Sequence, residues 1–309
     1  MLILGHKYTF TQLELEKLDK KFKNMTTIKC SDRNQNEVLR EIEETIDSRD
    51  FEILVLNTKV KVSDDIISYL TDKQFKMNKS KFKIISIENF MEEFLHKCYI
   101  PDDHRVLEFL EDFKPYSTWQ YIQKRAIDYF GVFWLFFFSW PVMLLCQKKI
   151  KEQSPGRILF EQERVGLNGE VFKCTKFRTM HEGSHHDPYT RENDTRIFPF
   201  GNIMRKRRLD ELPQMINILK GEMHLIGPRA EWNILVESYK KEIPYYHERH
   251  LVKPGITGWA QVNYPYGANI EDSKQKLMYD LYYIKHWNIA LELKVVYKTA
   301  MTVISKKGL

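Results

Sequence analysis

Cysteine is scarce in this sequence, and the few cysteines form no pattern. The 309 residues contain four of them, far apart and without a Cys-x-x-Cys pair: Cys30, Cys98, Cys146 and Cys174. Such spacing argues against a disulfide framework and a cysteine zinc site, and it favours a reducing compartment. The first residues, MLILGHKYTF, hold an apolar run too short for a signal peptide. We therefore expect the water-exposed parts of the protein to lie in the cytosol.

The N-terminal third lacks the glycine-rich loop of dinucleotide-binding proteins. Short segments rich in Ile, Leu and Val read as buried strands: MLILG, TTIKC, FEILVLN and FKIISI. Helical patterns follow them at Thr11–Lys23, Asn36–Ser48 and Asp64–Phe75 and after Glu88. This alternation predicts a Rossmann-like parallel sheet with helices on its faces. The first strand-to-helix turn, GHKYTF, has one glycine where the dinucleotide fingerprint needs three. Residues 1–115 are therefore expected to form a regulatory, dimerising or partner-binding module.

One stretch has no charged residue over 18 positions. Tyr129 to Cys146 reads YFGVFWLFFFSWPVMLLC, and as a helix it would cover about 27 Å, which is marginal for crossing a bilayer. Pro141 lies inside it and is expected to kink the helix. Cations flank both ends, at Lys124 and Arg125 and at Lys148, Lys149 and Lys151. A spanning helix usually has its positive excess on one side, so this pattern favours a hairpin at about 124–150 that enters and leaves on one face. A buried core helix is the alternative.

Positive charge is concentrated in the second part of the chain. Residues 1–115 have 19 Lys/Arg and 22 Asp/Glu, whereas residues 116–309 have 29 and 20. The second part is therefore expected to meet an anionic partner, which could be phosphate, nucleic acid or an acidic membrane. The basic, apolar ending at Tyr297–Ile304 suits a membrane surface. A polar loop holds His181, His185 and His186, which are either metal ligands or ordinary loop histidines.

The segment RKRRLDELPQ, from Arg205 to Gln214, places two carboxylates directly after a run of cations. The apolar spacing that follows predicts a helix with Pro213 in its first turn and Asp210 at or near its N-cap. The helix end and the neighbouring arginines are expected to keep Asp210 ionised well below neutral pH. A charged carboxylate can bind a metal or act as a nucleophile, and the cations suit phosphate, so the segment fits a Mg²⁺-diphosphate site. A solvated helix face is the plainer interpretation.

Three long motifs resemble the bacterial sugar transferase family of monotopic polyprenyl-phosphate phosphoglycosyl transferases. They are FEQERVGLNGEVFKCTKFRTM, LDELPQMINILKGEMHLIGPRAE and RHLVKPGITGWAQVNYPYGA, and KRAIDYFGVFWLFFFSWP resembles the family's re-entrant membrane helix. The resemblance covers about 120–305. It implies a mainly helical membrane domain at 116–309 after an N-terminal module like that of the larger members, whose N-terminal transmembrane helices we expect to be missing. The family's reaction transfers a sugar 1-phosphate from a UDP-sugar to undecaprenyl phosphate through a covalent aspartyl intermediate, and it releases UMP.

The resemblance also implies roles for individual residues. Asp210 would be the nucleophile, Asp210 and Glu211 would hold Mg²⁺, and Glu211 would alternatively position the acceptor. The phosphate and substrate pocket would be lined by Arg205, Arg229, Lys176 and Asp280. Ser139 and Pro141 would break the membrane helix, although Trp140 separates them here. The family's usual Pro-Arg-Pro is Pro228-Arg229-Ala230 in this chain.

The implied location is the bacterial inner membrane, with the active site on its cytoplasmic face. The implied partners are the UDP-sugar, undecaprenyl phosphate and membrane lipid, with a homodimer left open and no nucleic acid. The pathway would be the initiating step of exopolysaccharide, capsule, O-antigen or glycoprotein glycan assembly. A nucleic-acid binder would explain RKRR but neither the carboxylates nor the apolar run. A catalytically idle membrane scaffold would have little reason to keep Asp210, Glu211, Arg205 and Arg229 together.

Overall fold

The computed structural model describes residues 1–304 except 32, 49–50, 60–61, 78–81, 104–105, 107, 185–193, 266 and 268. The chain divides into two compact units, Met1–Tyr99 and Ile100–Leu309. The expected boundary at 115/116 thus falls inside the second unit, because residues before it dock there. The Tyr245 hydroxyl donates to the carbonyl of Asp103 at 2.7 Å, and Lys285 pairs with Asp112 at 2.7 Å.

The first unit alternates short strands and helices, as the sequence predicts. Its elements are β1 (Leu2–Leu4), α1 (Gln12–Asp19), β2 (Thr26–Ile28), α2 (Gln35–Ser48), β3 (Ile53–Leu56), α3 (Asp64–Met77), β4 (Lys83–Ser86), α4 (Ile87–Phe90) and the π-helical turn η1 (Met91–Leu95). The four strands pair in parallel in the order β2-β1-β3-β4, so the predicted parallel sheet is confirmed.

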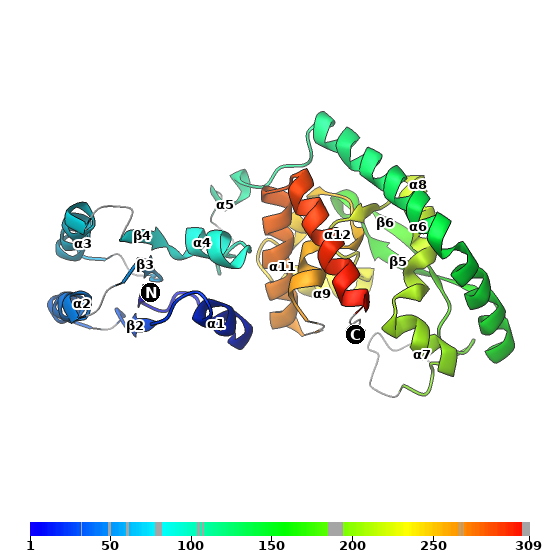
Figure 1. Ribbon diagram of the computed structural model, residues 1–309, viewed down its shortest axis with the longest axis horizontal. Coiled ribbons are helices and arrows are strands. Elements are labelled where there is room, and N and C mark those ends of the chain that lie inside the picture. Colours follow the sequence, from blue (N-terminus) through cyan, green and yellow to red (C-terminus); the bar gives the residue numbers. More distant parts are fainter. Residues whose placement is uncertain are drawn as a thin grey trace. The chain divides into compact units, whose positions relative to one another are not determined.

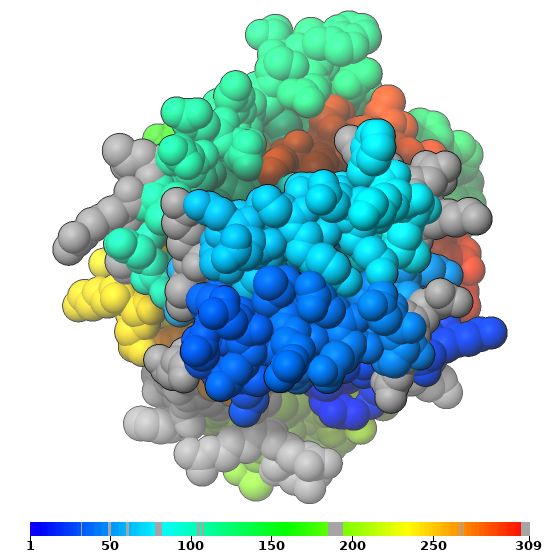
Figure 2. Space-filling model, turned by 90° about the vertical axis from the view of Figure 1, so that its left-hand side faces the viewer, coloured from blue at the N-terminus to red at the C-terminus, as the bar shows by residue number. Residues whose placement is uncertain are grey.

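The sheet of the first unit is covered by helices on both faces. On one face, Val38 and Ile42 of α2 and Ile66 and Leu70 of α3 bury against the strands. Figures 1 and 2 show α2 and α3 side by side on the outside of this unit, and Figure 1 shows α1 and α4 beyond the other face of the strands. The apolar spacing of α2 and α3 puts these residues on one side of each helix, which is why both dock on the sheet.

The loop after β1 packs tightly on the end of β3. A Cβ atom at Gly5, whose φ is +91°, would lie 2.5 Å from the carbonyl oxygen of Asn57, so this position requires glycine. The Asn57 side chain closes the same edge: its amide donates to Tyr8 O at 2.9 Å, and its oxygen accepts from Tyr8 N at 2.7 Å. Sheets of this kind bind ligands in the crevice where the strand order reverses. Here Gly5, after β1, packs directly against Asn57, after β3, at this point of the sheet.

The second unit is mainly helical, as expected, and contains two small sheets. Its elements are α5 (Glu108–Glu111), α6 (Thr118–Gln153), β5 (Leu159–Val165), the 3-10 turn η2 (Leu167–Gly169), β6 (Val171–Phe177), α7 (Pro199–Lys206), the 3-10 helix η3 (Leu209–Gln214), α8 (Met215–Lys220), β7 (His224–Ile226), α9 (Asn233–Glu242), the 3-10 helix η4 (Tyr246–Leu251), β8 (Gly255–Thr257), α10 (Trp259–Asn263), α11 (Ile270–Lys285) and α12 (Ile289–Ile304). Strands β5 and β6 form an antiparallel hairpin, and β7 pairs with β8 in parallel.

Helix α6 is one unbroken helix of 36 residues, about 54 Å long. A capping box starts it: Ser117 Oγ accepts from the Gln120 amide at 3.3 Å, and Gln120 Oε1 accepts from the Ser117 amide at 2.9 Å. The helix continues through Ser139 and Pro141, so the structure does not show the break expected at these residues or the hairpin expected at about 124–150. It is long enough and apolar enough to cross a membrane by length and composition.

Both ends of α6 pack on the rest of the second unit. Towards its start, Val132 joins a buried cluster with Ile218 and Met223; towards its end, Cys146 and Ile150 join another with Phe177. Between and around these contacts the helix exposes large apolar side chains: Phe130, Phe133, Trp134, Phe136, Phe137, Phe138, Trp140, Leu144 and Leu145. Figure 1 shows α6 running along the side of the unit, next to the β5–β6 hairpin and α8. The helix is thus attached along the unit and keeps an aromatic outer face.

A buried cation joins the start of α6 to α12. Lys124 is fully buried, and its Nζ donates to both carboxylate oxygens of Glu292 at 3.1 Å and to the carbonyl of Ile226 at 2.6 Å. Tyr283 and Trp287 also donate to Glu292, the indole at 2.7 Å. The Lys124 ammonium and the Glu292 carboxylate thus have hydrogen-bond partners besides each other. A buried ion pair needs such additional partners to offset the loss of water.

Candidate active site

The two candidate carboxylates lie in a 3-10 helix rather than at the start of an α-helix. Arg208 precedes η3 in the left-handed conformation, with φ 54°, and turns the chain between α7 and η3. Asp210 and Glu211 lie in the first turn of η3, which also contains Pro213, and the α-helix α8 begins only at Met215. Asp210, predicted at or near the N-cap of an α-helix, is instead the second residue of a 3-10 helix whose N-cap is Arg208. The spacing of apolar residues that suggested one α-helix is also compatible with a 3-10 helix followed by a short α-helix.

Glu211 is the carboxylate that the cations hold directly. Lys176, from β6, approaches its Oε1 to 3.0 Å, Arg229 approaches the same oxygen to 3.3 Å, and Arg208 lies 4.0 Å from Oε2. Burial by itself would raise the pKa of Glu211, but Lys176, Arg229 and Arg208 together hold this pKa below its usual range. Glu211 therefore stays ionised.

Asp210 has the opposite electrostatic environment. Burial raises the pKa of Asp210 above its usual range, and the negative charge of Glu211 adds to this, although Lys176 and Arg205 oppose it. The cations were expected to stabilise the ionised form of Asp210, but burial outweighs them and the pKa shifts in the opposite direction. Charge runs such as RKRR show where cations lie along the chain, but the direct ion pairs of this site go to Glu211. Asp210 is thus the more basic carboxylate of the pair.

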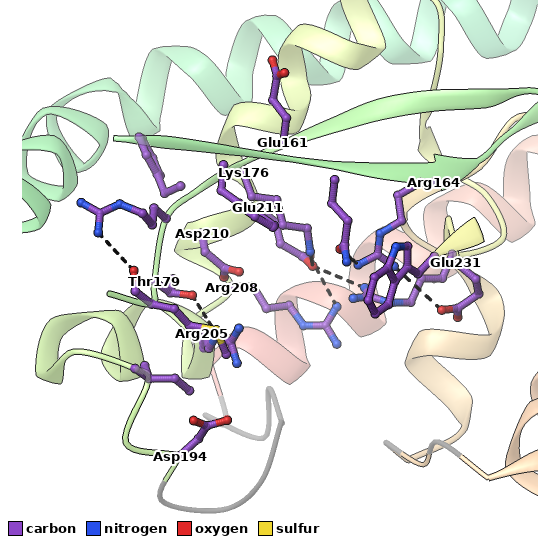
Figure 3. Close-up of a pocket in the computed structure, with 18 of the residues that line it drawn as sticks. Glu161, Arg164, Lys176, Thr179, Asp194, Arg205, Arg208, Asp210, Glu211 and Glu231 are labelled. Carbon is purple, nitrogen blue, oxygen red and sulfur yellow. Dashed lines mark hydrogen bonds and ion pairs between the residues drawn. The ribbon is translucent and has the colours of Figure 1, made fainter. Parts of the chain in front are cut away.

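Both carboxylates face a large cavity in the second unit. The cavity measures about 2480 Å³, and its walls include Lys176, Arg205, Asp210, Glu211, Arg229 and Asp280, so the structure brings the predicted pocket residues together. Figure 3 shows Asp210 and Glu211 pointing into the same space, with Lys176 and Arg205 on different sides of it. Arg205 comes from α7, and its Nε donates to Thr179 Oγ1 at 2.9 Å.

The far part of the cavity holds a second group of charges, of which sequence reasoning singled out only Asp280. Arg249 donates to the carbonyl of Arg229 at 2.9 Å and lies 2.8 Å from Asp280. Asp280 is almost fully buried, and burial raises its pKa to about 6. Arg164 lies 4.0 Å from Glu231 in the same walls. Arg164, Glu231 and Arg249 all lie within the three long motifs, and this position was the sequence signal that could have identified them.

The remaining candidates lie elsewhere. Ser139 and Pro141 belong to the middle of α6 and are not among the residues that line the cavity. His181 lines the cavity, whereas His185 and His186 lie outside the described residues. Among the described residues, no group of three or more His, Cys, Asp or Glu side chains could hold a metal ion. Asp210 and Glu211 nevertheless suit Mg²⁺, because this ion commonly uses one or two carboxylates together with waters and substrate phosphates.

Comparisons with known proteins give a consistent result. The model of the bacterial sugar transferase family matches residues 119–306. The chain is 43% identical over 170 residues to the UDP-N-acetylgalactosamine-undecaprenyl-phosphate N-acetylgalactosaminephosphotransferase of Aeromonas hydrophila, covering 54% of this chain and 40% of that protein. It is 42% identical over 173 residues to the UDP-glucose:undecaprenyl-phosphate glucose-1-phosphate transferase of Xanthomonas campestris pv. campestris, covering 54% and 36%.

A shorter relative is matched over more of its length. The chain is 36% identical over 188 residues to the UDP-glucose:undecaprenyl-phosphate glucose-1-phosphate transferase of Caulobacter vibrioides, covering 60% of this chain and 70% of that protein. By contrast, the chain spans only about two fifths of the length of the Aeromonas and Xanthomonas relatives.

Proposed function

The chain belongs to the bacterial sugar transferase family, and we propose that it transfers a sugar 1-phosphate from a UDP-sugar to undecaprenyl phosphate and releases UMP. One observation carries the proposal: two adjacent carboxylates with opposite pKa shifts face a cavity lined by cations. The relatives' names supply the substrate classes, a sugar nucleotide and undecaprenyl phosphate.

Asp210 is the proposed nucleophile. An oxygen of its carboxylate attacks the phosphorus that bears the sugar, the bond from this phosphorus to the bridging oxygen of the diphosphate breaks, and UMP leaves with that oxygen. A phosphate oxygen of undecaprenyl phosphate then attacks the same phosphorus and frees the Asp210 carboxylate. The raised pKa of Asp210 supports this role, because a more basic carboxylate is the better nucleophile once it is deprotonated.

The other residues bind and orient. Lys176 and Arg229 fix Glu211, and they place positive charge where the diphosphate of the substrate would lie. Arg205, from α7, also places positive charge in the wall of this cavity. Asp210 and Glu211 would hold Mg²⁺, and the bound ion would neutralise part of the negative charge of the diphosphate. Arg249 and Asp280 build the far wall and would bind the substrate away from the reacting phosphorus.

The same proposal places the protein on the cytoplasmic face of the inner membrane. The exposed aromatic residues of α6 suit lipid, and the cations on both flanks of its apolar run suit a segment that enters and leaves on one face. Helix α12 adds a second apolar surface, with Leu293 and Tyr297 exposed. The first unit would act as a regulatory or partner module, because the turn after β1 lacks the glycine-rich loop of dinucleotide-binding proteins. The product would start the assembly of a surface glycan.

Mass spectrometry tests the covalent step. Protein incubated with Mg²⁺ and a panel of UDP-sugars, without acceptor, should gain the mass of one phosphosugar on the peptide that contains Asp210. Hydroxylamine should remove the adduct, because an acyl phosphate is cleaved by this nucleophile, and EDTA should prevent its formation. Asp210→Asn should form no adduct and release no UMP.

Glu161→Gln is the matched control for this experiment. Glu161 is an exposed carboxylate in the wall of the same cavity, and Figure 3 shows it directed away from Asp210 and Glu211. This variant should form the adduct at the wild-type rate. An adduct that maps to another residue, or turnover by Asp210→Asn at a comparable rate, would contradict the mechanism.

A further inference from the structure

Arg178 occupies a buried position between the end of α6 and the end of β6. Its side chain is enclosed, and the residue is 6% exposed. Nε donates to the carbonyl of Arg157 at 2.5 Å, and Nη1 donates to Ser154 Oγ at 2.5 Å and to the carbonyl of Met180 at 3.1 Å. Nη2 donates to the carbonyls of Ser154 at 2.5 Å and Pro155 at 3.3 Å. One guanidinium therefore forms hydrogen bonds with several residues of the segment that follows α6.

The guanidinium is matched to this place by its shape and its charge. Ser154 is the C-cap of α6, and its amide donates to the carbonyl of Ile150 at 2.9 Å. A helix C-terminus carries partial negative charge, which a cation stabilises. The five acceptors point at three different nitrogens of a planar fork, a geometry that the single ammonium of lysine cannot reproduce.

The neighbours of Arg178 in the chain both contact the carboxylate site. Lys176, two residues earlier, reaches Glu211 at 3.0 Å. Thr179, the next residue, accepts from Arg205 Nε at 2.9 Å. The main chain of Arg178 also donates to Ile158 O at 2.9 Å, which continues the β5–β6 pairing by one residue. The segment 176–179 therefore connects the end of the apolar helix to two of the cations around Asp210.

We infer that Arg178 is a positioning residue, which fixes Lys176 and the Thr179–Arg205 pair relative to the end of α6. The inference rests on the proposed function for its catalytic consequence. It gives the membrane helix a second role: the placement of its C-terminal end sets the placement of cations in the active site. Arg178 lies in the wall of the cavity, but all three nitrogens of its side chain are engaged by main chain and by Ser154.

Arg178→Lys is the test, with Arg125→Lys as its matched control. Arg125 lies in the first part of α6 and donates to the carbonyl of Ile218 at 2.9 Å, to Tyr129 at 2.7 Å and to Asp128 at 3.3 Å, and these partners belong to α8 and α6. Both variants should lose thermal stability. Only Arg178→Lys should slow single-turnover adduct formation, by on the order of 10–100-fold, because small misplacements of catalytic groups have effects of this size. UDP binding should change little.

A second variant covers the case in which Arg178→Lys does not fold. Thr179→Val keeps the shape of the side chain but removes the acceptor for Arg205, so it should slow adduct formation, whereas Thr179→Ser should restore it. Equal losses of adduct rate in Arg178→Lys and Arg125→Lys would reduce Arg178 to a structural residue and overturn the inference. So would a normal rate in Thr179→Val.

Hydrogen–deuterium exchange separates this inference from the proposed function. Arg178→Lys should increase exchange in the peptides covering β6 and η3, residues 171–180 and 205–214, and Arg125→Lys should not. This result needs no substrate. A wild-type protein that forms no adduct would refute the proposed function alone, whereas unchanged exchange at 205–214 in Arg178→Lys would refute the positioning role alone.

Discussion

Replacing Lys124 by methionine tests how strongly the apolar helix is bound to the rest of the second unit. Lys124 is 0% exposed and the side chain of Glu292 is 2% exposed, so neither charge has water to replace its partner. After Lys124→Met, the Glu292 carboxylate keeps Tyr283 and Trp287 as neutral donors. Loss of one partner of a buried ion pair costs about 3–5 kcal/mol, and the two remaining donors put the expected value near 3 kcal/mol.

The shift in unfolding temperature follows from this value. For a domain of about 200 residues, each kcal/mol lowers the midpoint by roughly 2–4 °C, so Lys124→Met should lower it by about 6–12 °C. Tryptophan fluorescence during heating of the detergent-solubilised protein measures the midpoint. Adding Glu292→Gln removes the uncompensated charge, because a neutral amide oxygen can accept from Tyr283 and Trp287. The double variant should therefore be more stable than Lys124→Met alone. A shift below about 2 °C, or a double variant as unstable as the sum of the single ones, would refute the reasoning.

Three further predictions follow from the site and from the two units. Because the pKa of Asp210 is raised, the rate of adduct formation should fall as pH drops through a value above the ordinary aspartate range. Glu211→Gln should shift this fall in rate to lower pH, because it removes a neighbouring negative charge. Rapid-quench rates measured across pH would show no such shift if the reasoning fails. A protein that starts at Ile100 should still form the adduct in detergent, since the residues of the cavity all lie in the second unit; complete loss in a folded truncation would contradict this. Cysteines introduced at Trp119 and Lys149 should both react with a membrane-impermeant maleimide from the cytoplasmic side, against a low background because the four native cysteines are buried; labelling from opposite sides would mean that α6 spans the membrane.

The sequence predicted the order of elements in the first unit well, and the candidate site residues that it singled out line one cavity. Strands such as FEILVLN are buried on both faces of a parallel sheet and so read as continuous apolar runs. Lys176, Arg205, Arg229 and Asp280 come from four separate segments, and the structure brings them to one cavity, as the family motifs implied.

The electrostatic roles within the site could not be predicted from the sequence. Whether Asp210 or Glu211 takes the ion pairs depends on the turn at Arg208, whose positive φ directs the following side chains. Four consecutive cations in RKRR suggested that Asp210 would be held ionised, yet Lys176 and Arg229, from distant segments, instead lower the pKa of Glu211. The boundary between the units was also misplaced, because the docking of residues 100–115 depends on Tyr245 and Lys285, far along the chain.

The attachment of α6 at both ends has a consequence for how the protein rests on a bilayer. A helix held at one end can tilt to match the thickness of the lipid. Here Lys124 is held near one end and Ile150 is packed near the other, so the helix and the cavity would move as one body. When the bilayer becomes thicker or thinner, the height of Asp210 above the lipid headgroups changes with it. Membrane thickness would then change the distance that an acceptor phosphate must move out of the bilayer to reach Asp210.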